Sequence, residues 1–114
     1  MIVDRISIDC ARIRDWPSLH EEFATAFGFP DFYGKNMNAW IDCLTSLDAP
    51  EDRLSNVHCL PGSVLTLELQ NVAQFKEQFS ELYAAIVECS AFVNYRRIES
   101  GGSSVLALSY WASL

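Results

Sequence analysis

The stretch Phe29–Leu47 reads FPDFYGKNMNAWIDCLTSL, and it does more than any other to decide how the chain folds. Its first part, Phe29–Lys35, contains a glycine and is predicted to be a loop. Asn36 is expected to be the N-cap of a helix that continues to Leu47. Apolar residues then recur at helical spacing on one face: Met37, Trp40, Ile41 and Leu44. Polar residues recur at i, i+4 and i+7 on the opposite face, which we expect to meet solvent: Asn38, Asp42 and Thr45.

The regions on either side of this stretch predict an α/β fold. Strands are expected where apolar and polar residues alternate, and helices where apolar residues repeat every three or four positions. In chain order the first predicted elements are a strand Ile2–Cys10, a helix from its N-cap Asp15 to Gly28, the helix Asn36–Leu47, a loop Asp48–Gly62 and a strand Val64–Leu69. A long helix follows, with Asn71 and Gln74 at capping-box spacing at its start. Its apolar repeat fades over Ala91–Glu99, which leaves a second short helix or a bend open there, and the last element is a strand Val105–Trp111. Strands separated by helices favour parallel pairing. We therefore expect one small α/β domain over residues 1–114, with a three-stranded parallel sheet and about three to four helices.

The stretch Phe29–Leu47 also resembles the barstar family of barnase inhibitors. The Tyr33-Gly34 pair, Asn36 and the run Asp42-Cys43-Leu44-Thr45 have the mutual spacings of that family, and elsewhere the match is one of element order. The resemblance implies a barstar-like fold. It also implies an intracellular protein inhibitor, such as an immunity protein or antitoxin, whose partner is a basic ribonuclease. Under this interpretation the chain is not an enzyme.

The resemblance further implies which residues contact the partner. In the family, the aspartate at the place of Asp42 enters the ribonuclease active site and pairs with the cationic groups that hold substrate phosphate. A carboxylate can imitate phosphate there through charge-assisted hydrogen bonds. The predicted contact residues are Phe32, Tyr33, Gly34, Asn36, Asn38, Asp42, Thr45 and Ser46.

Several of these residues have a second interpretation. Asn36 serves as a helix cap, as a contact residue, or as both. Phe32 and Tyr33 belong either to the core or to the interface, where aromatic side chains often dominate binding. Thr45 and Ser46 are either contact residues or plain surface hydroxyls.

The chain departs from the family pattern at four positions. The family has an aspartate where this chain has Asn38, a tyrosine at Phe32, and tryptophans at Ile41 and Leu47. One interface charge and at least one hydroxyl are therefore missing, which leaves two hypotheses. The chain inhibits a basic ribonuclease other than barnase, or it is an interaction module of the same fold with a non-nuclease partner. Later glutamates could add acidic contacts, but no motif assigns them: Glu77, Glu81 and Glu88.

Composition and charge agree with a soluble cytoplasmic binding protein. Half of the 114 residues are hydrophobic, which is enough for a core, and no apolar run is long enough to span a membrane. The N-terminal residues carry charges where a signal peptide would need an apolar segment. The net charge of −7 disfavours nucleic acid and favours a basic partner.

Cysteines and histidines give no sign of a metal, a cofactor or catalysis. The four cysteines lie far apart, and only His58 and Cys59 are neighbours, so free thiols are expected, with Cys43 on the inner side of its helix. His20 is expected to be a partly exposed helix residue with no nucleophile beside it. The basic pair Arg96-Arg97 is expected to pack on a sheet edge or to pair with Glu99.

Overall fold

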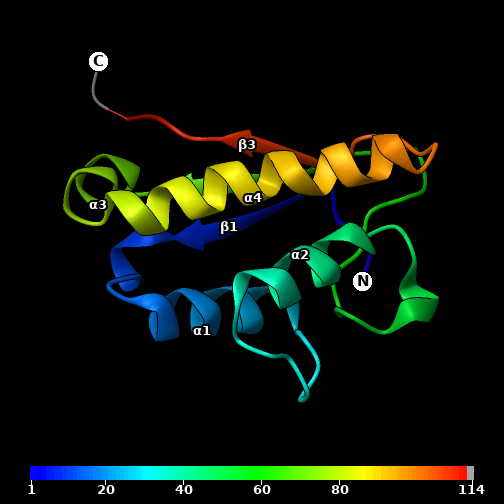
Figure 1. Ribbon diagram of the computed structural model, residues 1–114, viewed down its shortest axis with the longest axis horizontal. Helices are drawn as coiled ribbons and strands as arrows, with labels where there is room; N and C mark the ends of the chain where they lie inside the picture. Colours follow the sequence, from blue (N-terminus) through cyan, green and yellow to red (C-terminus); the bar gives the residue numbers. More distant parts are fainter. Residues whose placement is uncertain (113–114) are drawn as a thin grey trace.

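A computed structural model describes residues 1–112, in which helices cover one face of a three-stranded sheet (Figure 1). The elements in chain order are β1 (Arg5–Asp9), the 3-10 turn η1 (Cys10–Arg12), α1 (Trp16–Phe27), α2 (Met37–Thr45), the 3-10 turn η2 (Pro50–Asp52), β2 (Leu65–Gln70), α3 (Val72–Gln78), α4 (Ser80–Glu99) and β3 (Leu106–Ser109). The predicted α/β class and its three-stranded sheet are confirmed. Within the described residues, no helix is both long and apolar enough to cross a membrane.

The sheet has the order β1-β2-β3, and both pairs of strands are parallel. Register places Ile6 beside Leu67 and Leu67 beside Leu108, so one face of the sheet is apolar. The other face is polar, because Ser7 lies beside Glu68 and its hydroxyl donates a hydrogen bond to that carboxylate at 3.3 Å. Side chains alternate between faces along a strand, and the helices therefore pack on the apolar face alone.

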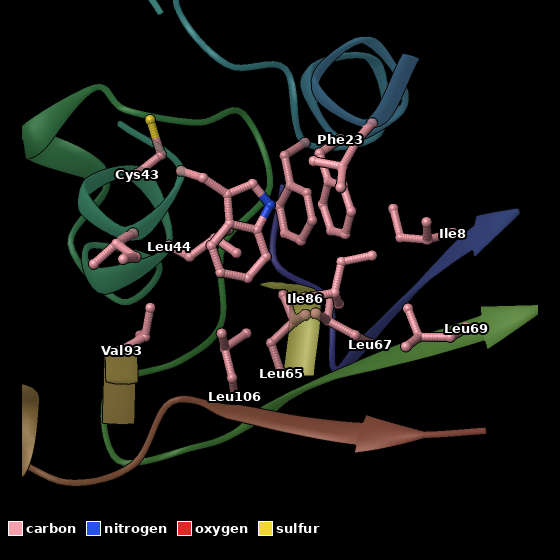
Figure 2. Close-up of a cluster of buried hydrophobic side chains, with 14 of the residues drawn as sticks. Ile8, Phe23, Cys43, Leu44, Leu65, Leu67, Leu69, Ile86, Val93 and Leu106 are labelled. Carbon is pink, nitrogen blue, oxygen red and sulfur yellow. The ribbon is translucent and has the colours of Figure 1, made fainter. Parts of the chain in front are cut away.

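The core lies between that apolar face and the helices α1, α2 and α4 (Figure 2). Trp40 of α2 is fully buried at its centre, and the ring of Phe23 from α1 meets it edge-on with 5.4 Å between ring centroids. Cys43 is also buried on the inner side of α2, and all four cysteines are free thiols. The core thus fixes the orientation of α2, whose outer face carries the predicted contact residues.

The predicted boundaries of α1 and the start of α2 are confirmed. The Asp15 carboxylate accepts from the Ser18 backbone N–H at 2.9 Å, and the Asp15 backbone N–H donates in return to the Ser18 hydroxyl oxygen at 3.1 Å. Gly28 ends α1 in the left-handed region at φ +68, a conformation that glycine adopts readily. Asn36 caps α2 as expected, although α2 ends at Thr45 rather than Leu47.

The capping box predicted at Asn71 is wrong. Asn71 has φ +60, and its side chain donates to the Asp9 carboxylate at 2.9 Å instead of capping a helix. The predicted long helix is also divided, because α3 ends before Phe79 and α4 starts after it. Conversely, α4 continues to Glu99, through the region where the apolar repeat fades. The repeat fades because apolar side chains of α4 lie on its exposed side: Phe92, Tyr95 and Ile98.

The segment of residues 48–62 is a loop, as predicted, and it is fastened to the domain by backbone hydrogen bonds. Asn56 donates to the carbonyl of Phe27 at 2.8 Å, and Cys59 donates to that of Leu47 at 3.0 Å. His58 also forms an isolated parallel bridge with Ile2, which precedes β1. These bonds hold the loop against the rest of the domain.

Candidate protein-binding surface

Asn36 connects the loop before α2 to the first turn of the helix. The side-chain oxygen of Asn36 accepts from the Ala39 backbone N–H at 2.8 Å, and its side-chain amide donates to the Gly34 carbonyl at 3.2 Å. Gly34 passes so close that a Cβ added there would lie 3.2 Å from the Asn36 amide nitrogen. The structural role of Asn36 is thus clear, while both residues remain exposed at the surface.

The aromatic pair of the loop is divided between surface and core. Phe32 is 76% exposed, whereas Tyr33 is only 8% exposed and packs against Phe29 with 4.7 Å between ring centroids. The Tyr33 hydroxyl also forms a hydrogen bond with Nδ1 of His20. The structure therefore assigns the side chain of Tyr33 to the core alternative and leaves Phe32 available to a partner.

The expectation that His20 is partly exposed is wrong. His20 is 3% exposed, at the junction of α1 with the loop that carries Tyr33. Burial disfavours the imidazolium form and lowers the pKa of His20, and burial likewise raises the pKa of the Tyr33 hydroxyl. The sequence does contain a signal of this burial. Leu19 and Phe23 are apolar and lie on the same face of the helix as His20, which indicates that this face packs on the core.

The outer face of α2 presents Asn38 and Asp42, both exposed. Thr45 lies on the same face but is half-buried, and its hydroxyl donates to the Ile41 carbonyl at 2.6 Å. Ser46 is half-buried as well. We call the exposed residues of this region the α2 surface: Phe32, Gly34, Asn36, Asn38 and Asp42.

Asp42 has a partner within the chain that sequence reasoning missed. Nη1 of Arg96 on α4 lies 2.9 Å from its Oδ1, and the side chains are 43% and 62% exposed for Arg96 and Asp42 respectively. The predicted pairing of Arg96 with Glu99 or a sheet edge is wrong, because α4 lies beside α2 and turns Arg96 toward it. The two residues are 54 positions apart, so no local pattern could have shown the contact.

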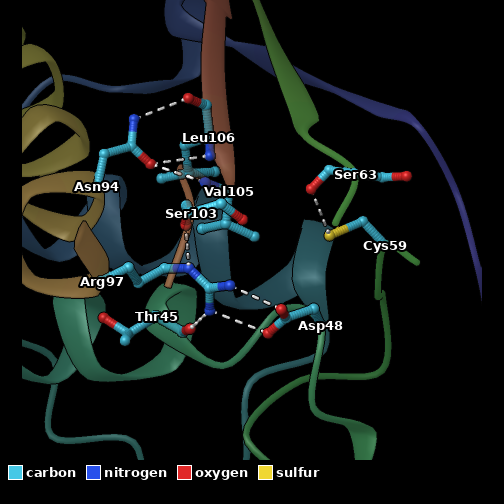
Figure 3. A network of polar contacts seen from close by, with 9 residues as sticks. All are labelled: Thr45, Asp48, Cys59, Ser63, Asn94, Arg97, Ser103, Val105 and Leu106. Carbon is cyan, nitrogen blue, oxygen red and sulfur yellow. Dashed lines mark hydrogen bonds and ion pairs between the residues drawn. The ribbon is translucent and has the colours of Figure 1, made fainter. Parts of the chain in front are cut away.

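The neighbouring Arg97 points into the domain instead (Figure 3). It donates to both carboxylate oxygens of Asp48, at 2.9 and 2.6 Å, and to the backbone carbonyls of Thr45 at 2.7 Å and Ser103 at 2.8 Å. Hydrogen bonding from Arg97 lowers the pKa of Asp48. These contacts join the end of α2 to α4 and to the segment before β3.

The described residues offer no alternative site with an obvious chemistry. Among residues 1–112, no three His, Cys, Asp or Glu side chains gather in a way that could hold a metal ion. The three later glutamates considered from sequence are exposed on α3 and α4, and nothing places them at the α2 surface: Glu77, Glu81 and Glu88. The α2 surface with its adjacent arginine is therefore the best candidate for binding.

Comparison with known proteins agrees with the resemblance seen in the sequence. The family model described as Barstar (barnase inhibitor) matches residues 3–100, which extends the similarity far beyond the stretch 29–47. A search of the curated proteins gives no match.

Proposed function

The chain belongs to the barstar family, and we propose that it is an intracellular inhibitor of a basic ribonuclease, acting as an immunity protein or antitoxin. The observation that carries this proposal is the exposed carboxylate of Asp42 on a helix whose position is fixed by the core. A partner can reach this carboxylate, whereas the neighbouring residues on the inner side of α2 are all buried: Trp40, Ile41, Cys43 and Leu44.

The α2 surface would block the nuclease cleft by charge and by shape. Asp42 would occupy the phosphate position, where arginine or lysine side chains donate hydrogen bonds to a carboxylate as they do to phosphate. Phe32 would supply an apolar contact, and Gly34 would let the partner approach the backbone closely. Little ordering is required on binding, because Asn36 and Tyr33 already hold the loop.

Overall charge supports a basic partner. The chain carries a net charge of −7, so a basic protein is attracted over distance before contact. Added salt should slow this association, because the Debye length is about 10 Å at 0.1 M and about 3 Å at 1 M. Acidic composition alone also serves solubility, so charge supports the proposal without carrying it.

A non-nuclease partner is the second candidate function, and a specific observation favours it. Asn38 has no charge and Asp42 is paired with Arg96, so the α2 surface is less acidic than the family pattern implies. An interaction module of this fold would tolerate both features.

Inhibition of RNA hydrolysis separates these two functions. The purified protein is added in increasing amounts to a panel of basic secreted ribonucleases that includes barnase. We expect stoichiometric inhibition of at least one enzyme by wild type and much weaker inhibition by Asp42→Ala. Asp4→Ala is the matched control, because Asp4 is an exposed aspartate outside the α2 surface. Absence of inhibition across the panel would favour the interaction module.

A further inference from the structure

Asp42 is part of an ion pair and not an isolated carboxylate. Arg96 approaches it from α4, which runs beside α2 (Figure 1), through one contact of 2.9 Å between Nη1 and Oδ1. Both side chains are substantially exposed, and such pairs contribute little to folding. The pair is therefore better placed to act in recognition than in stability.

The pair leaves hydrogen-bonding groups for a partner. Between residues 1 and 112, the contact with Asp42 is the only side-chain hydrogen bond of Arg96, and the contact with Arg96 is the only one of the Asp42 carboxylate. Oδ2 of Asp42 can thus accept from a second cation. Nε and Nη2 of Arg96 can donate to a second anion, since a guanidinium has five N–H donors in a planar fork.

A partner that covers Asp42 must also cover Arg96, because the two side chains are in contact. If the partner offers only a cation, the covered triad of one carboxylate and two cations carries an excess positive charge. A buried charge without an anionic partner is strongly unfavourable. An acidic group on the partner, next to its cation, removes this excess.

We propose that the α2 surface recognises a partner with a carboxylate beside its cationic group, and that Arg96 is the specificity-determining residue that binds this carboxylate. The proposal rests on the proposed function and specifies the kind of ribonuclease. Carboxylates are common general bases in acid–base catalysis, so a nuclease cleft can hold one near the cations that bind phosphate. The fork of Arg96 suits bidentate binding of such a group.

Two exposed aromatic side chains lie close to Arg96 in the sequence of α4. Phe92 lies one helical turn before Arg96, and its ring stacks on that of Tyr95 with 6.1 Å between centroids. Phe92 is 44% exposed and Tyr95 is 58% exposed, so a partner can reach both rings. Aromatic residues and arginine are both enriched in protein interfaces, so this part of α4 agrees with the role of Arg96.

Three variants test the proposal against the ribonuclease panel, barnase included. Arg96→Gln removes the cation. The exchange variant Asp42→Arg with Arg96→Asp keeps an ion pair between α2 and α4 but reverses both charges toward the partner. Arg12→Gln is the matched control, because it removes a guanidinium from the exposed pair with Asp9 outside this surface. Binding is measured by calorimetry at low salt, and urea midpoints verify that each variant folds.

We expect the Kd to rise at least about tenfold for Arg96→Gln, to rise further for the exchange variant, and to stay unchanged for Arg12→Gln. An unchanged or lower Kd for Arg96→Gln would overturn the proposal, since Arg96 would then only compete with the partner's cation. Recovery of wild-type binding by the exchange variant would also overturn it. If neither wild type nor any variant binds, the proposed function itself is contradicted. If wild type and Arg96→Gln bind with the same Kd, only this inference is contradicted.

Discussion

Two adjacent arginines of α4 each pair with an aspartate from the α2 region, in opposite settings. The Arg97 side chain is 14% exposed and binds both oxygens of Asp48 as well as two backbone carbonyls. The Arg96 side chain is 43% exposed and makes one contact with Asp42. One helical step rotates a side chain by about 100°, and this rotation turns one arginine into the domain and the other toward solvent.

The difference teaches which charges serve the fold and which are available to a partner. We call Arg97–Asp48 the inner pair and Arg96–Asp42 the outer pair. Loss of either residue of the inner pair leaves a charge and several hydrogen-bonding groups unsatisfied in a largely buried place. Loss of either member of the outer pair leaves the other in water, where it is well solvated. Inner and outer pairs should therefore respond oppositely in assays of stability and binding.

The largest expected effect is on binding, in Asp42→Ala. Removal of the carboxylate leaves the partner's cations unpaired at the interface, so affinity for the ribonuclease should fall by about 2–5 kcal/mol. The free energy of unfolding should change by less than about 1 kcal/mol, because the pair with Arg96 is exposed. Titration calorimetry and urea unfolding measure both quantities. A large loss of stability would remove the contrast with the inner pair.

Arg97→Ala should have the largest effect on folding. It removes the charge partner of Asp48 and two bonds to backbone carbonyls, at a cost of about 3 kcal/mol. Arg97→Lys should be intermediate, since lysine keeps the charge but loses the planar fork. Arg96→Ala is the control and should cost less than about 1 kcal/mol. Equal urea midpoints for Arg97→Ala and Arg96→Ala would contradict the comparison.

A smaller effect is expected from acid, through His20. Burial lowers the pKa of His20 in the folded state, so the unfolded state binds more protons as the pH falls below about 6.5. The contribution of neutral His20 to the free energy of unfolding should be fully present above that pH and should decrease as the pH falls toward the pKa of His20 in the folded state.

The variant His20→Gln isolates this effect, because glutamine can bond Tyr33 but does not titrate in this range. Urea unfolding between pH 7 and pH 5 should show a decline in wild type and a flatter profile in His20→Gln. Identical profiles for wild type and His20→Gln would show that His20 does not cause the decline in stability.

Asp48 affects stability at a lower pH. Its lowered pKa contributes stability that is lost only as the pH falls below about 3.9.

The smallest expected effect is that of Asn38→Asp, which restores the charge of the family pattern on the α2 surface. Asn38 is exposed in the first turn of α2, where a carboxylate is favourable by about 0.3–1 kcal/mol, so stability should be kept or slightly raised. Affinity for barnase should increase. A decrease would indicate that the enzyme presents an acidic group opposite this position.

Much of the fold could be predicted from sequence because its signals are local. Asp15, Gly28 and Asn36 act on their own helices within a few residues, and alternation along each strand marks the sheet. Local signals fail at Asn71. Its spacing from Gln74 is that of a capping box, but its side-chain amide donates a hydrogen bond to the carboxylate of Asp9, which is 62 residues away.

The candidate surface could be predicted only in part, for the same reason. The position of Asp42 and Asn38 on the outer face of α2 follows from helical spacing. The partners of Asp42 and Asp48 do not, because Arg96 and Arg97 approach from an element about half a chain away. The division of Phe32 from Tyr33 depends on His20 of α1, which is likewise a tertiary contact.

Occupation of a phosphate site by Asp42 is tested most directly by competition with a mononucleotide. The wild-type protein is titrated into the ribonuclease of the panel that binds it most tightly, at constant ionic strength and with increasing concentrations of a 3′-mononucleotide that binds in the active site. The apparent Kd should rise in proportion to the nucleotide concentration, because the carboxylate and the phosphate cannot occupy one site together. An apparent Kd that is independent of the nucleotide would contradict active-site inhibition through the α2 surface.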